Sequence, residues 1–222
     1  MSRYLSALVG IAAAVSAVAC GNSGSATVSD APAPQPASAR IELPESVAYP
    51  EGIAHDAATG SLYTASAENG TVVRVNAATG AAEVLVPAGT LVPEGNTTFP
   101  GPLGMSVDAS NRLWIAGGFT GKAWVVNTAD GSVIKEVTVP TAPKSLINDV
   151  AIVGSAGYFT DTFVPTLWRV SETNGTFGDV EPWLDLTGTP IAYGDGPNLN
   201  GIADTPDGQT LMAFVDVTEI AN

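Results

Sequence analysis

From Ile41 onward, short apolar segments alternate with turns, and the same arrangement returns about every 50 residues. Each copy begins with a small or polar pair, continues as a short apolar segment, passes through a turn and ends in a second apolar segment. The four copies begin at 50–56, 102–108, 147–152 and 199–204. No long helical periodicity is present. Short strands repeated at this length are typical of a β-propeller, so we predict an all-β chain of this class.

The alternation within each copy predicts four strands for a complete blade. The first blade is expected at about 49–88, the second at about 103–140 and the third at about 145–186. Asn69-Gly70 and Asp130-Gly131 mark hairpin turns of the kind that favour positive φ. We also expect a short leading strand at 41–43.

The fourth copy contains two strand patterns, at 201–204 and 210–216, and no third or fourth one. The chain therefore holds about three and a half blades, whereas closed propellers have four to eight. We expect a truncated version of a longer propeller, and an unusual small propeller is the alternative. Open ends of this kind expose blade edges that invite pairing with another chain.

The first 19 residues have the pattern of a signal peptide. Arg3 precedes an apolar stretch of about 14 residues, which is too short to span a membrane. The stretch ends at Ala19-Cys20, which resembles a bacterial lipobox, with Ala17 where that motif usually has leucine. We expect a lipid on Cys20 that tethers the chain to a membrane. An ordinary signal peptide that leaves a free thiol is the alternative.

Residues 20–40 are rich in alanine, serine and proline, a composition that predicts a flexible tether. The globular part is then 41–222, a partial β-propeller domain. Together these segments predict a lipid-anchored, extracytoplasmic protein of a bacterial cell envelope. Cys20 is the only cysteine, so no disulfide can form within the chain.

The charge of the chain excludes one class of partner. There are 22 acidic and 8 basic residues, a formal net charge of −14. Nucleic-acid binding needs a basic surface to neutralise phosphates, so we expect no nucleic-acid partner.

The start of each repeat carries the candidate chemistry. Glu51, Leu103, Asn148 and Asn200 occupy the equivalent position in the four copies. Because the first strand of each propeller blade lines the central channel, these side chains should converge on the axis. A carboxylate and two amide oxygens are hard ligands of the kind that Ca²⁺ takes. Each residue alone could instead serve a turn or a strand start, but their shared repeat position favours a divalent cation site, with Ca²⁺ the best fit.

The chain resembles the senescence-marker-protein/gluconolactonase family, regucalcin-like propellers of six blades, over about 45–216. The resemblance rests on short motifs at the start of the four copies: Pro50-Glu51-Gly52, residues 104–108 followed by Leu113-Trp114, Asn148-Asp149, and Asn200-Gly201 before 206–208. This family holds one divalent cation with a Glu, two Asn and an Asp. The resemblance implies that Glu51, Asn148 and Asn200 are metal ligands. The Asp of the family, also its proposed base, would come one blade later, beyond Asn222.

The resemblance implies metal-assisted hydrolysis of a small-molecule lactone or ester, in an incomplete and possibly inactive chain. A non-catalytic cell-surface propeller that binds a ligand or a protein is the alternative, and a degenerate product with no stable fold is a third. Asp149 is expected beside the metal ligands rather than among them. Asp161 could face the mouth of the channel, and Tyr193 and Asp195 could lie on its rim.

Overall fold

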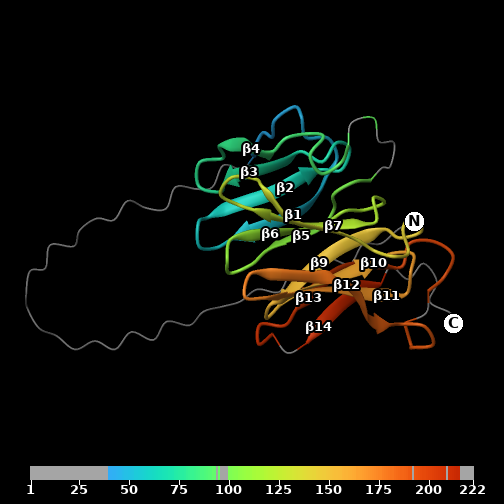
Figure 1. Ribbon diagram of the computed structural model, residues 1–222. Helices are drawn as coiled ribbons and strands as arrows, with labels where there is room; N and C mark the ends of the chain where they lie inside the picture. The colour runs from blue at the N-terminus through green and yellow to red at the C-terminus, as the bar shows by residue number, and fades with distance from the viewer. Residues whose placement is uncertain (1–39, 94, 96–99, 192, 209, 216–222) are drawn as a thin grey trace, which may run out of the picture. The chain divides into compact units, whose positions relative to one another are not determined.

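The computed structural model describes residues 40–93, 95, 100–191, 193–208 and 210–215, and in these ranges all regular structure is β-strand (Figure 1). This confirms the all-β prediction. The candidate lipidation site Cys20, the signal peptide and most of the tether lie outside the described residues. No helix that could span a membrane occurs among the described residues.

The strands form successive antiparallel sheets in chain order, each a simple meander. The first sheet contains β1 (Pro50–Asp56), β2 (Ser61–Ser66), β3 (Val72–Asn76) and β4 (Ala82–Val86). The second contains β5 (Met105–Val107), β6 (Arg112–Ala116), β7 (Lys122–Asn127) and β8 (Val133–Thr138). The third contains β9 (Ile147–Val153), β10 (Ala156–Asp161), β11 (Thr166–Thr173) and β12 (Thr176–Asp185). A two-stranded sheet follows, β13 (Leu199–Asp204) and β14 (Leu211–Val215). We call these blades 1 to 4.

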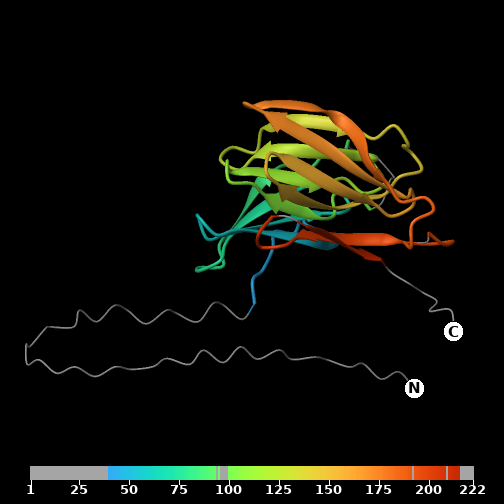
Figure 2. The same ribbon diagram turned by 90° about the horizontal axis from the view of Figure 1, so that it is seen from below.

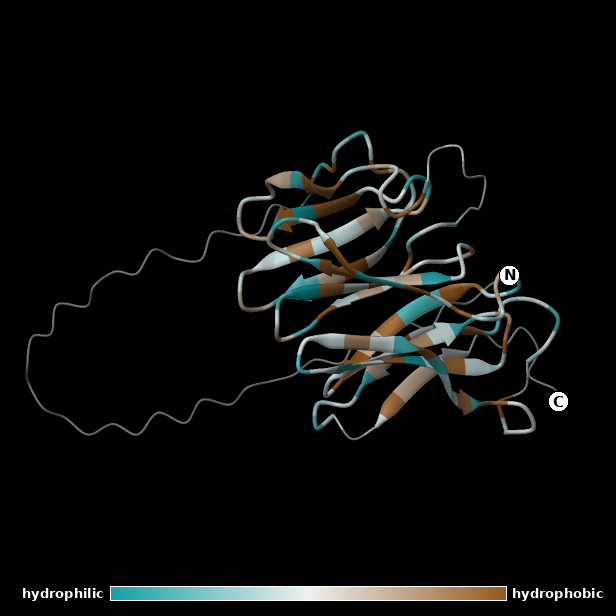
Figure 3. Ribbon diagram, in the orientation of Figure 1, coloured by the Kyte–Doolittle hydropathy of each residue, from teal (hydrophilic) through white to brown (hydrophobic). Residues whose placement is uncertain are grey.

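The sequence predicted these blades because their turns and strand alternation are local signals. Gly70 and Gly131 adopt φ of 76° and 74° in the two expected hairpin turns, a conformation that glycine reaches without steric cost. Apolar stretches recur along the strands (Figure 3), and in the middle strands β6 and β7 four consecutive residues are buried. The leading strand expected at 41–43 is wrong. Ile41 and Leu43 instead line a hollow on the face of blade 1, so they do not extend an edge of its sheet.

The blades pack face to face around their first strands, with β1 beside β5, β5 beside β9 and β9 beside β13. In the view of Figure 2, blade 1 (cyan) and blade 4 (red) both lie along the lower edge, with blades 2 and 3 above them. The described blades therefore follow an arc around a common side.

Each pair of neighbouring blades encloses its own hydrophobic cluster. Tyr63 of blade 1 packs with Leu113 and Trp124 of blade 2. Trp114 of blade 2 belongs to the next cluster, with Phe159 of blade 3. The third cluster contains Leu167 of blade 3 with Leu199 and Ile202 of blade 4. Since burial of a large apolar side chain stabilises by about 1.5–3 kcal/mol, the contacts between blades are the main source of cohesion.

Candidate metal site in the axial pocket

Three of the four first strands have a β-bulge at the repeat position that carries the candidate ligands. In blade 1, Pro50 pairs with Ser66 and Ile53 with Thr64, so Glu51 and Gly52 together face a single residue of β2. A bulge bends its strand and re-aims a side chain out of the regular alternation. The bulge therefore explains how Glu51 turns toward the axis.

The same bulge recurs in blades 3 and 4. In blade 3, Asn148 and Asp149 together lie opposite Thr160, since the flanking pairs are Ile147 with Asp161 and Val150 with Phe159. In blade 4, Asn200 and Gly201 lie between the pairs Leu199–Val215 and Ile202–Ala213. The two-residue motif that repeats in the sequence is thus a two-residue bulge in the structure.

Blade 2 has the equivalent pattern of hydrogen bonds without a ligand. The Leu103 N–H donates to the Ala116 carbonyl at 2.8 Å, and the Ala116 N–H donates to the Gly104 carbonyl at 2.9 Å. The Leu103 side chain is buried in a small apolar cluster with Ala67 and Leu146. Blade 2 therefore contributes packing, and not an oxygen donor, at this position.

Gly104, which directly precedes β5, lets the neighbouring first strands approach closely. A Cβ on Gly104 would lie 2.6 Å from Cα of Asp149, closer than real Cβ atoms come. The Gly104 N–H donates to the Asn148 carbonyl at 2.8 Å, which joins blades 2 and 3 at the axis. A larger residue at Gly104 would push the Asn148–Asp149 bulge outward.

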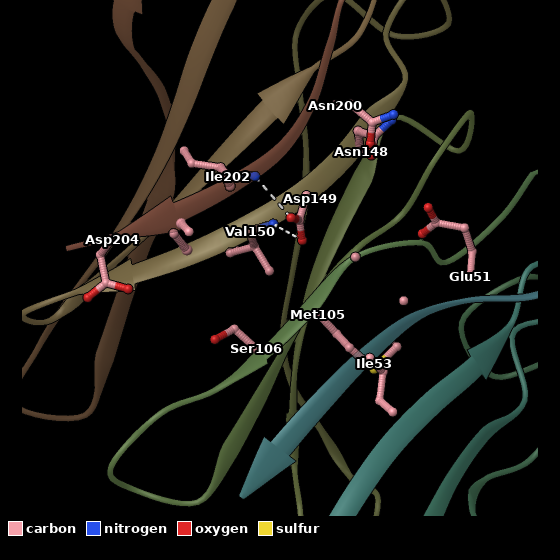
Figure 4. Close-up of a pocket in the computed structure, with 14 residues that line it drawn as sticks. Glu51, Ile53, Met105, Ser106, Asn148, Asp149, Val150, Asn200, Ile202 and Asp204 are labelled. Carbon is pink, nitrogen blue, oxygen red and sulfur yellow. Dashed lines mark hydrogen bonds between the residues drawn. The ribbon is translucent and has the colours of Figure 1, made fainter. Parts of the chain in front are cut away.

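The four first strands line a pocket of about 410 Å³ (Figure 4). Glu51, Asn148 and Asn200 all line it, so the structure brings the three predicted ligands together from three blades. Ser106 and Asp204 also line it and were not predicted. Ser106 stands two residues after Gly104, so strand alternation beyond the bulge was the signal that could have found it. Asp204 carried no comparable signal.

Asn148 is oriented by its amide nitrogen. Nδ2 donates to Thr162 Oγ1 at 3.0 Å, and Thr162 Oγ1 donates to the Leu199 carbonyl at 2.7 Å. Among the hydrogen bonds between described residues, none engages Oδ1 of Asn148. The oxygen, which is the atom that a cation would bind, is therefore the end of the amide left for the pocket.

Asp149 connects two blades through both carboxylate oxygens. Oδ1 accepts from the Val150 N–H at 2.8 Å, and Oδ2 accepts from the Ile202 N–H at 3.0 Å (Figure 4). The second bond crosses from β9 to β13. Asp149 thus lies beside the three candidate ligands and holds two of the bulges in place.

The pocket has an unbalanced negative charge. Burial raises the pKa of Glu51, and the nearby Asp149 carboxylate raises it further. Burial also raises the pKa of Asp149, against the lowering effect of its bonds from Ile202 and Val150. Glu51 still reaches solvent on the open side of the pocket. No lysine, arginine or histidine is among the lining residues, so nothing basic in the described chain neutralises this site.

The other three candidate residues do not line this pocket. Asp161 is fully buried, and its carboxylate accepts from the backbone N–H groups of Leu146, Phe163 and Val164 and from the indole of Trp168. Tyr193 donates its hydroxyl to the Asp161 carbonyl at 2.6 Å, and burial raises the pKa of that hydroxyl. Asp195 is exposed outside the pocket. Asp161 and Tyr193 therefore brace the turn after β10.

No family model matches this chain, and no curated protein matches its sequence. Solved propellers are similar in structure. A virginiamycin B lyase from Staphylococcus aureus superposes with a TM-score of 0.57 at 18% identity, covering 79% of this chain and 51% of the lyase. A gluconolactonase from Xanthomonas campestris superposes with a TM-score of 0.52 at 22% identity, covering 75% of this chain and 54% of the gluconolactonase.

These likenesses show the fold, a β-propeller, and confirm the sequence prediction of that class. They also show that this chain spans about half the length of the propellers it matches.

Proposed function

We propose that this chain carries the cation site of a lactonase-like propeller, in which Glu51, Asn148 and Asn200 bind a divalent cation, with Ca²⁺ the best fit. The observation that carries the proposal is the set of equivalent bulges, which direct one carboxylate and two amides from three blades into one pocket. Ca²⁺ takes oxygen donors of both kinds. The uncompensated negative charge around Glu51 and Asp149 also suits a cation.

The chemistry proposed for this site is hydrolysis of a small-molecule lactone or ester. A bound cation would polarise the substrate carbonyl and stabilise the developing oxyanion. The residues of the chain supply positioning: Thr162 orients Asn148, and Asp149 fixes the spacing of β9 and β13. A substrate in the rest of the pocket would meet the Ser106 hydroxyl and the Asp204 carboxylate.

A non-catalytic binding propeller is the second candidate, and the state of Asp149 favours it. Both oxygens of that carboxylate already accept backbone N–H groups, so Asp149 is poorly placed to take a proton from water. A pocket of this kind could bind a cation and a ligand without turnover.

The proposed location is the bacterial cell envelope, outside the cytoplasm. A lipid on Cys20 would hold the propeller at a membrane, with 20–40 as its tether. The acidic chain suits this location, because the lipid rather than surface charge would supply the membrane affinity.

Thermal unfolding of the full chain tests the cation site. Ligand at about 100 times its dissociation constant stabilises a folded protein by about 2.7 kcal/mol, so saturating Ca²⁺ should raise Tm by about 5–10 °C relative to EDTA. Glu51→Gln should abolish the rise, because it removes the only charged ligand of the set. Glu83→Gln, a matched change on the outer strand β4, should leave the rise intact.

The outcomes separate the two candidates. A Ca²⁺-dependent rise together with Ca²⁺-dependent hydrolysis of a lactone supports the enzyme. The same rise without hydrolysis of lactones or esters supports the binding propeller. A cooperative transition that Ca²⁺ does not move would refute the cation site.

A further inference from the structure

Two buried hydroxyls lie between the bulges that carry Asn148 and Asn200. Thr160 is in β10 and Thr162 directly follows that strand, and their side chains belong to residues that are 0% and 3% exposed. Each Oγ1 makes one hydrogen bond to blade 3 and one to blade 4. A buried hydroxyl destabilises the fold unless it is hydrogen-bonded, and here both groups are fully used.

Thr162 determines which end of the Asn148 amide faces the pocket. The Leu199 carbonyl can only accept, so it takes the single hydroxyl hydrogen of Thr162, at 2.7 Å. Toward Asn148 the same hydroxyl is then left as an acceptor. Only the amide nitrogen can donate to it, which Nδ2 does at 3.0 Å. The amide therefore has one favoured orientation, with Oδ1 turned away from Thr162 and left for the pocket.

Thr160 joins the backbones of the two bulges. Its Oγ1 accepts from the Asp149 N–H at 3.1 Å and donates to the Asn200 carbonyl at 2.6 Å. The residue that carries the third candidate ligand is therefore fixed in place relative to the bulge of blade 3. Figure 4 shows the amides of Asn148 and Asn200 at the same end of the pocket.

The other complete blades show that the fold itself does not need these hydroxyls. By strand register, the equivalent positions hold small residues without a hydroxyl, and all of them are buried: Ala65 and Ala67 in blade 1, and Ala116 and Gly118 in blade 2. Of the three complete blades in the described chain, only blade 3 has threonines there. Blade 3 and its neighbour, blade 4, both carry an amide ligand at the axis.

The junction of blades 2 and 3 makes the corresponding bond from the backbone. The Gly118 N–H donates to the Ile147 carbonyl at 2.8 Å, and Ile147 occupies the repeat position of Leu199. Adjacent blades can thus be joined at this point without a side chain. A hydroxyl in place of the N–H adds what a backbone donor lacks, which is an acceptor for the amide of Asn148.

We propose that Thr160 and Thr162 are positioning residues of the cation site, which make Asn148 and Asn200 a preformed pair of amide ligands. This inference rests on the proposed function, since it concerns the ligands proposed there. Neither threonine is among the residues that line the pocket, so both act through the groups that they bond. Partners that orient the ligands of a metal typically contribute about 10- to 100-fold to its affinity.

Calorimetric titration of Ca²⁺ into the full chain tests the role of both threonines. Thr162→Ala and Thr160→Ala give blade 3 the residues that blade 1 has at these positions, so the fold should accept them. Each should raise the dissociation constant of Ca²⁺ by about 10-fold or more. Thr162→Ser keeps the hydroxyl and should bind Ca²⁺ close to the wild-type affinity.

Thr128→Ala is the matched control for loss of a buried hydroxyl. Thr128 is 5% exposed and donates to the Asn111 carbonyl at 2.7 Å, outside the lining of the pocket. Its substitution should lower Tm in EDTA about as much as Thr162→Ala does, and should leave the dissociation constant of Ca²⁺ unchanged.

A double-mutant cycle tests whether Thr162 acts through Asn148. In an Asn148→Ala background, Thr162→Ala should weaken Ca²⁺ binding no further, because the amide that it orients is gone. Melts in EDTA show whether each variant folds. Should Thr162→Ala fail to fold, Thr162→Val removes the hydroxyl and keeps the volume, and the same result is expected of it.

The outcomes separate this inference from the proposed function. If wild type binds Ca²⁺ and the alanine variants bind it equally well, the inference is overturned and the proposed function stands. The same holds if Thr162→Ala weakens binding equally with and without the Asn148 side chain, or if Thr128→Ala weakens it as much. If wild type binds no Ca²⁺, the proposed function fails and this inference fails with it.

Discussion

The carboxylates at the axis and those on the outer strands of the same blades have opposite surroundings. On the outer strands, one glutamate of each complete blade has a basic partner across the sheet: Glu83 with Arg74 at 2.6 Å, Glu136 with Lys122 at 2.7 Å and Glu181 with Arg169 at 2.6 Å. At the axis, Glu51 and Asp149 line one pocket, with no basic residue among its lining residues. Within the same blade repeat, these outer-strand glutamates are therefore paired with a basic residue, whereas the carboxylates of the first strands at the axis are not.

The pKa directions follow this difference. Burial raises the pKa of Glu136, but Lys122 and the Trp124 indole outweigh it and hold the pKa below its ordinary value. Burial and Asp149 both raise the pKa of Glu51. Ionised Glu136 thus favours the folded state, whereas ionised Glu51 and Asp149 cost stability. A bound cation would make the ionised axial carboxylates stabilise the folded state instead of destabilising it. The contrast between the two regions is therefore consistent with the proposed cation site.

The largest effect should come from Asp149, whose carboxylate stabilises two bulges. Asp149→Ala leaves the N–H groups of Val150 and Ile202 without their acceptors, and each such loss costs about 1–3 kcal/mol. Relief of the repulsion with Glu51 offsets only part of this. We expect the free energy of unfolding in urea to fall by about 2–4 kcal/mol.

Asp149→Asn is the matched control, since it keeps one carbonyl oxygen and removes the charge. Its loss should be clearly smaller than that of Asp149→Ala. If Asp149→Ala unfolds at the wild-type urea concentration, the carboxylate does not hold the blades and its hydrogen bonds contribute nothing net.

The repeat in the sequence was enough to predict the blades and to bring Glu51, Asn148, Asn200 and Asp149 into one place. Equivalent positions in a repeat converge whenever the repeats pack around one axis, so no knowledge of individual contacts was needed. The bulge itself was not predictable, because an offset in pairing depends on the partner strand. Ser106 was missed although strand alternation from Gly104 offered a signal for it.

Asp161 shows a second limit of prediction from the sequence. A carboxylate at the end of a strand could face a channel or satisfy the turn that follows, and both choices use the same residue type. The structure places it in the turn, where it accepts from three backbone N–H groups and the Trp168 indole. The expected leading strand at 41–43 was wrong for a related reason: an apolar segment can pack on a sheet face as well as on an edge.

Glu136 should give a moderate and pH-dependent effect. Because its folded pKa is lowered, its contribution to stability is present above about pH 4.5 and is lost as pH falls through the folded pKa. The side chain is 44% exposed, so solvent screening limits Glu136→Gln to a loss of about 0.5–1 kcal/mol at pH 7. Urea unfolding at pH 7 and pH 3 should show this difference shrink in acid. A difference that stays constant would mean that packing, and not charge, is what the variant changes.

Substitution of Arg169 should have the smallest effect on stability. It tests whether every outer ion pair stabilises its blade equally, or only a pair that has a buried neighbour. Its guanidinium bonds Glu181 at 2.6 Å, as short as any outer pair, but no buried indole shares the carboxylate as Trp124 shares Glu136. Exposed ion pairs of this kind contribute little, because water and salt screen them. Arg169→Gln should therefore leave the urea midpoint unchanged within error, at low and high salt alike. A loss as large as that of Glu136→Gln would mean that an outer ion pair stabilises its blade without help from a buried indole. The outer acids would then differ from the axial acids in having a basic partner, and not in what buries them.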